Sequence, residues 1–460
     1  MKKFSNQMAL IMAALFLAVA TARAATYTNL YDFSTLSPTE TNLDGSGPLA
    51  DLVSSGSVLY GTADDGGTNG LGTIFAINTD GTDFTVLHYF DFPTNGEGAS
   101  AGMVVSGNML YGTTRAGGTN GLGTVFAIST SGKGYVLLHQ FGSRLGTDPA
   151  TQLNTNSAGA FPETVLVLSG NTLYGATEQG GGGGNGTLFK LDTSGSGFTV
   201  LHDFTNQDGG FPSVHMVVSG SNLFGTTQFG GDAPDAGSGL GNGVVFRVGT
   251  NGLGFTNLYN FTESAYGPLA GLVLSGQTLY GTTTVGTPGP GGAPYGSVFK
   301  INTDGTGFTN FYILNPELNA GDPRSGLVIQ GNTIYATSLG FDYGGTVFAV
   351  NTDGSGYTNL TSFDGPTYPG TLSGLVFSGG TLYGTARNGG TNNDGVLFSL
   401  GLFPALNIQL VNKTVVLSWG DPSLSLYTAS TLSSVFTNIP SATSPHTNAI
   451  TGSQQYFQVR

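Results

Sequence analysis

The chain has 460 residues, a formal net charge of −14 and no cysteine. The lack of cysteine excludes disulfides and thiolate metal ligands, and the acidic charge argues against binding to nucleic acid or to an anionic membrane surface. Glycine supplies 77 residues and charged residues only 9 %. Because the glycines punctuate runs of aliphatic and aromatic residues, they predict turns in an all-β protein.

Residues 1–24 have the pattern of a Sec-type signal peptide. Lys2 and Lys3 precede an apolar run, Met8 to Ala20, and Ala22-Arg23-Ala24 offers a cleavage site after Ala24. A membrane anchor is the alternative, but the run is shorter than the ~20 residues that a spanning helix needs. No later stretch is long and apolar enough to span. We therefore expect a secreted, extracellular or cell-surface protein without a transmembrane segment after cleavage.

A tetrapeptide such as Leu-Tyr-Gly-Thr recurs seven times from residue 59 onward. Its aromatic residues are Tyr60, Tyr111, Tyr174, Phe224, Tyr280, Tyr335 and Tyr383. Repeats with a period near 50 residues are typical of propeller blades.

Each repeat divides into four short strands, which we call A to D. In the fifth repeat they are expected at 271–274, 278–283, 296–301 and 308–311, with a tight turn at 302–305 between C and D. The recurrent glycine inside strand B, here Gly281, would weaken an ordinary strand. It predicts that a neighbouring backbone or ring packs closely against it.

The two ends of the array complement each other. Six repeats contain a strand D, whereas the seventh stops after strand C at Val396–Leu400. The segment Tyr27–Phe33 closely resembles the strand D at Phe255–Phe261. A ring in which the N-terminal strand completes the last blade has no exposed array end. The sequence therefore predicts a seven-bladed β-propeller over residues 25–401, with an open solenoid as the alternative.

Residues 402–460 lack the repeat motif. Strands are expected at 405–411, 414–419, 424–429 and 454–459, with Trp419 as a core residue. Fewer than ~60 residues are marginal as an independent fold. We expect a small β-sandwich-like module with a role in anchoring or secretion.

The repeat at 110–128, Leu-Tyr-Gly-Thr-Thr followed by Gly-Gly and Gly-Leu-Gly-Thr-Val-Phe-Ala-Ile, resembles the GloVer tandem repeat of bacterial secreted, choice-of-anchor proteins. The resemblance covers about residues 25–400 and implies export and surface residence. It supplies no catalytic residues, and the chain lacks one common anchoring pattern, a terminal apolar helix followed by basic residues. The tail, with Tyr456-Phe-Gln-Val-Arg460, resembles a C-terminal module of other secreted proteins from the same bacteria.

In a propeller, the B–C and D–A loops share one face, and in this chain they are the long and variable ones. Binding residues collect on such loops above a rigid scaffold. Glu163 is one of the acidic residues in the D–A loops. The ligand-binding candidates in the B–C loops are Asp64, Asp65, Arg115, Glu178, Asp232, Asp235, Asp342, Arg387 and Asp394.

Calcium is the one cofactor that we consider, because it prefers carboxylate oxygens, but no spacing matches a known calcium loop, so no cofactor is our working expectation. The equivalent positions of His88, His139 and His202 in strand D, where other copies have tyrosine, indicate a structural role at a blade edge. His215 adjoins strand A and is expected to line the channel or to be buried and hydrogen-bonded.

Two functions remain open at this point. The first is a monomeric, non-catalytic propeller scaffold that binds a glycan or a surface protein through the variable-loop face. The second is a secreted carbohydrate-active enzyme that uses carboxylates on the same face, since a carboxylate pair ~5–9.5 Å apart can hydrolyse glycosides. The sequence assigns no catalytic residue.

Overall fold

The structure is a computed structural model of the whole chain. It describes residues 25–142, 146–147, 154–213, 215–231, 241–262, 267–284, 295–314, 321–339, 344–363, 373–402, 407–411, 414–418, 426–429, 437–439, 442–443, 446–449 and 456–459. The expected signal peptide, Trp419 and the candidates Asp232, Asp235 and Asp342 lie outside the described residues. In the described part no helix is long and apolar enough to cross a membrane.

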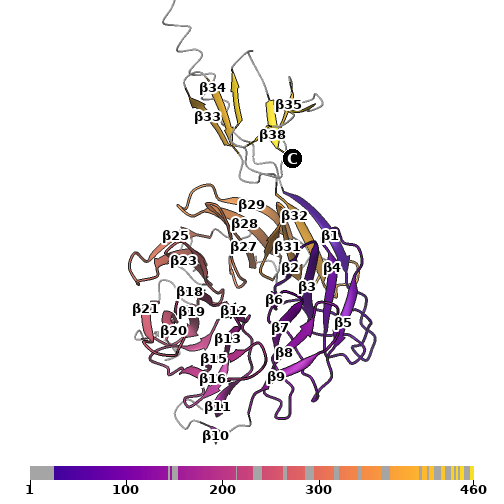
Figure 1. Cartoon of the computed structure of the whole chain (residues 1–460), viewed down its shortest axis with the longest axis vertical. Helices are drawn as coiled ribbons and strands as arrows, with labels where there is room; N and C mark the ends of the chain where they lie inside the picture. Colours follow the sequence, from indigo (N-terminus) through magenta and orange to yellow (C-terminus); the bar gives the residue numbers. More distant parts are fainter. Residues whose placement is uncertain are drawn as a thin grey trace, which may run out of the picture. The chain divides into compact units, whose positions relative to one another are not determined.

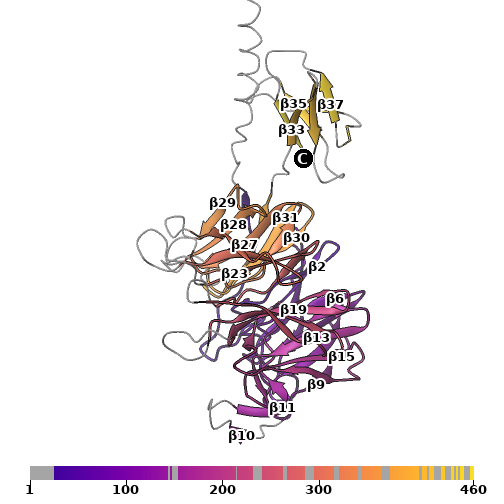
Figure 2. The ribbon, with the colours of Figure 1, turned by 90° about the vertical axis from the view of Figure 1, so that its left-hand side faces the viewer.

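Internal contacts divide the chain into two compact units. Unit 2 comprises Thr28–Ser378 and Tyr383–Ser399, and unit 1 comprises Met1–Tyr27, Gly379–Leu382 and Leu400–Arg460. The sheets of unit 2 follow one another around a ring (Figure 1). Figure 2 shows β27, β28 and β29 side by side within one of these sheets.

Seven sheets of the described residues share one antiparallel order, in which strands A, B, C and D of a repeat lie side by side. The first four sheets are β2 (Val53–Ser55), β3 (Val58–Ala63), β4 (Thr73–Asn78) and β5 (Thr85–Tyr89); β6 (Val104–Ser106), β7 (Met109–Thr114), β8 (Thr124–Ser129) and β9 (Val136–Gln140); β12 (Val167–Ser169), β13 (Thr172–Thr177), β15 (Thr187–Asp192) and β16 (Thr199–Asp203); and β18 (Val217–Ser219), β19 (Asn222–Phe229), β20 (Val244–Gly249) and β21 (Thr256–Asn260).

The remaining sheets continue the pattern. They are β22 (Val273–Ser275), β23 (Thr278–Thr283), β24 (Ser297–Asn302) and β25 (Thr309–Ile313); β26 (Val328–Gln330), β27 (Thr333–Leu339), β28 (Gly345–Asn351) and β29 (Thr358–Phe363); and β30 (Val376–Ser378), β31 (Thr381–Ala386) and β32 (Val396–Gly401). In the last sheet the outer strand is β1 (Thr26–Asp32), which lies beside β32. The N-terminal strand thus takes the place of the missing strand D.

Two long loops add strands that the repeat pattern did not predict. Strands β10 (Gly146–Thr147), β11 (Asn154–Ala160) and β14 (Gln179–Gly181) form a separate sheet. Strand β17 (Gly210–Pro212) pairs with β19.

The C-terminal segment forms two three-stranded sheets. One contains β33 (Asn407–Val411), β34 (Thr414–Ser418) and β37 (His446–Ala449), and the other contains β36 (Thr437–Asn438), β35 (Leu426–Ala429) and β38 (Tyr456–Val459). The described residues of the four predicted strands are all β-strand, and β36 and β37 were missed.

The glycine of strand B is explained by an aromatic ring. In the fourth repeat Gly225 lies opposite Phe246, and a Cβ added at Gly225 would lie 2.5 Å from Phe246 Cζ. The equivalent phenylalanines of strand C are all fully buried, and they are Phe75, Phe126, Phe189, Phe246, Phe299, Phe348 and Phe398. The predicted close packing is therefore a phenylalanine ring over the glycine.

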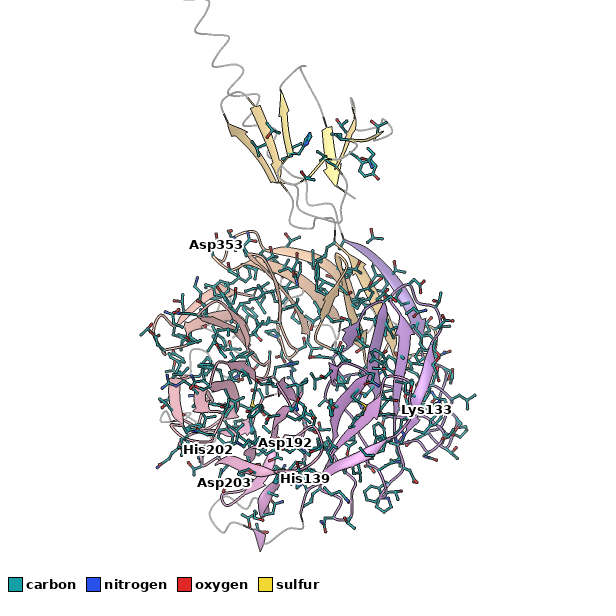
Figure 3. All side chains as sticks on the ribbon, in the orientation of Figure 1. Lys133, His139, Asp192, His202, Asp203 and Asp353 are labelled. Carbon is teal, nitrogen blue, oxygen red and sulfur yellow. The ribbon has the colours of Figure 1, made fainter. Side chains whose placement is uncertain are left out.

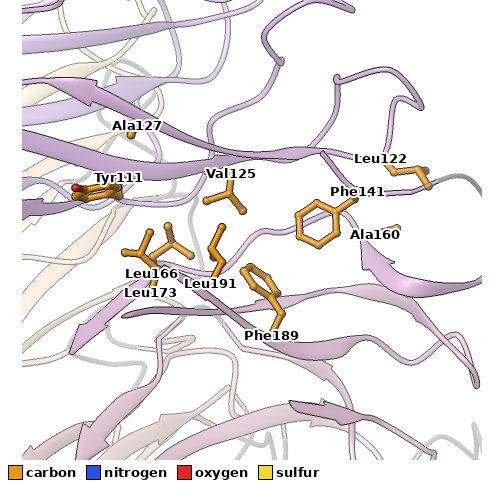
Figure 4. Packing of buried hydrophobic residues seen from close by; sticks show 10 residues of the cluster. All are labelled: Tyr111, Leu122, Val125, Ala127, Phe141, Ala160, Leu166, Leu173, Phe189 and Leu191. Carbon is orange, nitrogen blue, oxygen red and sulfur yellow. The ribbon is translucent and has the colours of Figure 1, made fainter. Parts of the chain in front are cut away.

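The core lies between neighbouring sheets. One cluster joins Tyr111, Val125 and Phe141 of the second repeat to Leu173 and Phe189 of the third (Figure 4). Apolar residues on both faces of each sheet are thereby buried, as the sequence pattern requires.

The threonine that follows the strand B glycine (Ala336 in the sixth repeat) ties adjacent repeats together. Thr282 Oγ1 donates a hydrogen bond to the carbonyl of Pro323 at 3.3 Å. Thr337 Oγ1 donates likewise to Ser373 at 3.1 Å. Thr385 of the seventh repeat donates to the carbonyl of Ala50, before strand A of the first, at 3.3 Å. The same contact thus joins the last repeat to the first.

Candidate functional site

The D–A loops run beside the residues that follow strand B. Ser46 bridges with Asp65, and Glu97 with Ala116. At the opposite end of the strands the A–B and C–D turns meet, for example where Thr303 N–H donates a hydrogen bond to Gln277 O at 2.9 Å. The described parts of the B–C and D–A loops therefore lie at one end of the sheets, which we call the variable-loop face.

The residue directly after strand B is charged in four adjacent repeats. In ring order, the seventh, first, second and third repeats supply Arg387, Asp64, Arg115 and Glu178, which we call the charged arc. The equivalent residues of the fourth to sixth repeats are Gln228, Thr284 and Leu339. At this register, the charged side chains therefore lie in four consecutive repeats.

Ion pairs fix both arginines of the arc. Arg387 Nη2 lies 3.6 Å from Asp65 Oδ2. Arg115 Nε pairs with a carboxylate oxygen of Glu163, and its Nη2 lies 3.9 Å from Glu178 Oε2. Half of each arginine side chain remains exposed. The guanidinium groups are therefore held in place and still accessible.

Phe161 supports one of these arginines. Arg115 Cζ lies 5.6 Å from the centroid of the Phe161 ring, within range of a cation–π contact. Phe161 has φ 58°, and Phe211, at the equivalent place in the next repeat, has φ 55°. Their counterparts Gly47 and Gly98 have similar positive φ values, so two bulky residues occupy a backbone conformation suited to glycine.

Asp64 differs from the other carboxylates of the face. Its pKa is raised to about 6, mainly by burial and then by Asp65 and Glu163, against the lowering effect of Arg387 and Arg115. The arginines moderate the shift without cancelling it, because each is paired with another carboxylate. Burial also raises the pKa of Glu163 and Glu178.

A second polar pair lies at the start of strand A, where neighbouring strands A contact one another (β2 with β6 and β30, β12 with β18). The seven equivalent residues are Asp51, Gly102, Val165, His215, Gly271, Gly326 and Gly374. His215 Nε2 contacts Asp51 Oδ2, and Gly374 N–H donates to Asp51 Oδ1. We call Asp51 and His215 the axial pair.

His215 therefore lies on the inner side of the ring, which is one of the two roles that its sequence position left open, and it contacts Asp51. Asp51 was missed, although a signal was present. At this register, four repeats have glycine and a fifth has valine, so Asp51 and His215 are the two polar residues. The partner of Asp51 is 164 residues away, which no local pattern reveals.

Asp394 has a structural contact. Its Oδ1 accepts a hydrogen bond from Ser46 Oγ at 3.3 Å, and its Oδ2 accepts one from Leu36 N–H at 3.3 Å. It thus holds the first D–A loop against the seventh repeat.

The strand D histidines form stacks between repeats. His139 stacks on Phe198 with centroids 3.6 Å apart, and His202 stacks on Phe255 at 3.8 Å. Tyr259 makes the same stack on Phe308, so histidine replaces tyrosine in a packing role. Figure 3 shows His139 and His202 toward the outside of the ring. Burial lowers the pKa of both His88 and His139 to about 4.

Metal binding has no geometric support in the part of the chain that the structure describes. There, no three side chains of His, Cys, Asp or Glu are grouped so that they could hold a metal ion.

The repeats match the model of the Gloeobacter/Verrucomicrobia repeat over residues 19–161, 152–293 and 235–411. The chain belongs to the Gloeobacter/Verrucomicrobia repeat family. The family expected from the LYGT motif is therefore confirmed. No curated protein matches this repeat protein.

Solved structures similar to this Gloeobacter/Verrucomicrobia repeat protein have ring-shaped β folds. An oligogalacturonate lyase in complex with manganese is 10% identical with a TM-score of 0.50, over 83% of this chain and 97% of that one. The WD40 repeats of RRP9 are 10% identical with a TM-score of 0.51, over 83% and 99%. At such low identity the likeness shows the fold alone, an all-β, propeller-like arrangement.

Proposed function

We propose that this chain is an exported, seven-bladed propeller scaffold that binds a glycan through the charged arc. Seven repeat sheets, six of four strands and one of five among the described residues, and the place of β1 beside β32 support the blade number and the closure. The signal-like residues 1–24 support export to the cell surface or medium. The C-terminal sheets would then serve as the anchoring or secretion module.

The observation that carries the proposal is the arc itself. Four neighbouring repeats place charged residues at one register, and the arginines are already oriented by Asp65, Glu163 and Glu178. Guanidinium groups donate and carboxylates accept hydrogen bonds, so together they can satisfy sugar hydroxyls. Because the ion pairs exist before binding, little side-chain entropy is lost when a ligand docks.

The test is a binding screen of the secreted protein against cello-, chito- and galacturono-oligosaccharides by isothermal titration calorimetry. Arg115→Gln and Arg387→Gln should each weaken binding roughly 10- to 100-fold, the loss of a charge-assisted hydrogen bond. Lys133→Gln is the control, because it removes one exposed positive charge from a C–D turn on the opposite side. Equal losses of affinity in all three variants would indicate non-specific electrostatic binding. Binding of a surface protein without binding of any saccharide would overturn the glycan as the ligand in favour of a protein.

A carbohydrate-active enzyme is the second candidate, favoured by one observation. A carboxyl whose pKa is about 6 can hold a proton near neutral pH, as a general acid must. The same screen therefore includes chromatography of the products. Product formation by the wild type that disappears in Asp64→Asn would establish catalysis and overturn the purely binding scaffold.

A further inference from the structure

The apolar cores of the ring join neighbouring repeats. Six hydrophobic clusters of the described residues each contain side chains from two adjacent repeats, for example Tyr174 of the third with Phe246 of the fourth. The seventh and first repeats meet in the same way, where Leu397 and Phe75 share one cluster. When the units of an array contact only their neighbours, one junction can open while the remaining units stay folded.

The axial pair joins repeats that are not neighbours. Asp51 belongs to the first repeat and His215 to the fourth, and the second and third repeats lie between them in the chain. His215 Nε2 contacts Asp51 Oδ2. Gly374 of the seventh repeat donates its N–H to Asp51 Oδ1. The carboxylate of Asp51 therefore connects the fourth repeat with the junction between the seventh and first repeats.

Glycines of the fifth, sixth and seventh repeats enclose the pair. A Cβ on Gly326 would lie 2.9 Å from His215 Nε2 and 3.3 Å from Asp51 Oδ2. A Cβ on Gly374 would overlap the Asp51 carboxylate, and one on Gly271 would overlap His215. The side chains of His215 and Asp51 are only 24% and 17% exposed. The glycine backbone thus packs directly against the contact and restricts both side chains to it.

No other charged residue competes for either partner at this register, because the remaining five positions are glycine or valine. A carboxylate and an imidazole attract each other most strongly when the imidazole carries a proton. A contact that is largely shielded from water is also screened less than one on the surface. The pair is therefore placed to resist separation of the repeats that it joins.

We propose that the axial pair is a latch across the ring, which couples the fourth repeat to the junction between the seventh and first repeats. This is the junction where β1 lies beside β32. It also carries the ion pair of Arg387 with Asp65, so opening of the junction would separate part of the charged arc. The latch acts whatever ligand the arc binds.

Hydrogen–deuterium exchange of the purified full chain, read by mass spectrometry, tests the coupling. Opening of the junction detaches β1 from β32, so the backbone amides of residues 28–33 and 396–399 report it. In His215→Ala these amides should exchange at least about 10-fold faster relative to those of β8 in the second repeat, as expected for loss of a contact with a charged group. A purely local role of His215 would instead accelerate exchange only in the third to fifth repeats.

The same register supplies a matched control. Val165 of the third repeat is half-buried and belongs to no part of the axial contact, so Val165→Ala should leave the exchange of residues 28–33 and 396–399 unchanged. The double variant Asp51→Ala/His215→Ala should exchange no faster there than Asp51→Ala alone, because both substitutions remove one contact.

Asp51→Asn is the milder variant. It removes the charge but keeps an oxygen that can accept the hydrogen bond from Gly374 N–H. It should accelerate exchange of the same two segments by a smaller factor than Asp51→Ala does. Urea unfolding shows that each variant is folded before its exchange is measured.

Three results would overturn the latch. They are acceleration in His215→Ala that is equal in β8 and at the junction, acceleration confined to the third to fifth repeats, and additive effects in the double variant. Saccharide binding is measured separately, so a chain that binds no glycan loses the proposed function and keeps the latch.

Discussion

Replacement of Gly225 by alanine tests why strand B carries glycine. The new methyl would lie 2.5 Å from Phe246 Cζ, 2.9 Å from its Cε1 and 3.1 Å from Met216 Cγ. Phe246 is fully buried, so it cannot swing into solvent. Overpacking of this kind costs ~1–3 kcal/mol. Alanine loses less backbone entropy than glycine on folding, which offsets ~0.5–1 kcal/mol of that cost. We expect Gly225→Ala to lose about 1–2 kcal/mol of unfolding free energy.

The sixth repeat provides the reciprocal change. Ala336 lies opposite Phe348 there, and Leu327 is only partly buried, whereas its counterparts Leu52 and Leu272 are buried. We attribute the lower burial of Leu327 to the methyl of Ala336, which stands where the other repeats have glycine. Ala336→Gly removes one methyl, worth ~0.8 kcal/mol, and adds the entropic cost of a strand glycine, ~0.5–1 kcal/mol. It too should be destabilising by about 1–2 kcal/mol.

Urea unfolding followed by tyrosine fluorescence measures both variants, and an unchanged m-value shows that the midpoint reports stability. Gly142→Ala is the control, because a Cβ there meets none of the described residues within 4 Å and its φ is not positive. An unchanged or higher midpoint for Gly225→Ala would refute the explanation, since the ring would then not exclude a methyl.

Three further predictions concern titration and ring closure. His139→Tyr should preserve the stack on Phe198. Because the folded-state pKa of His139 is about 4, below the ~6.5 of the unfolded chain, the free energy of unfolding of the wild type falls as pH drops from ~6.5 to ~4. Urea titrations at pH 7.5 and 4.5 should show that the variant loses about 1 kcal/mol less between these pH values than the wild type does. Asp64 has a folded-state pKa of about 6, above the ordinary ~3.9, so the free energy of unfolding falls as pH rises from ~4 to ~6. Asp64→Asn should therefore raise the free energy of unfolding by about 1–2 kcal/mol at pH 7.5. An unchanged free energy of unfolding would contradict the burial of a charged carboxylate. Phe33→Ala, at the fully buried end of the N-terminal segment, should cost ~3–5 kcal/mol, whereas Leu253→Ala, 70% exposed, should cost less than ~0.5 kcal/mol; equal effects would mean that the segment does not close the ring.

Much of the local structure follows from the sequence because it depends on short-range chemistry. The period-two pattern and the Asn-Thr-Asp-Gly turn predict the strands of the fifth repeat, and strand B at Thr278–Thr283 agrees in both bounds. Gly305 has φ 89° and its N–H donates to Asn302 O at 2.9 Å, as that turn requires. The extra strands β11 and β17 were missed because they arise inside loops without alternation.

The repeat register also determined that the N-terminal strand completes the last sheet, because Tyr27–Phe33 has the same side-chain pattern as the other D strands. Only the tertiary structure decided which residues meet. Contacts such as Thr385 with Ala50, or Asp51 with His215, join segments far apart in the chain. Their proximity depends on the angle between successive sheets, which is set by the aromatic side chains packed between them. That angle results from many contacts together, and no local sequence pattern contains it. The carboxylates of the variable-loop face could be named from the sequence, but the raised pKa of Asp64 follows from its burial in the folded chain and from the neighbouring Asp65.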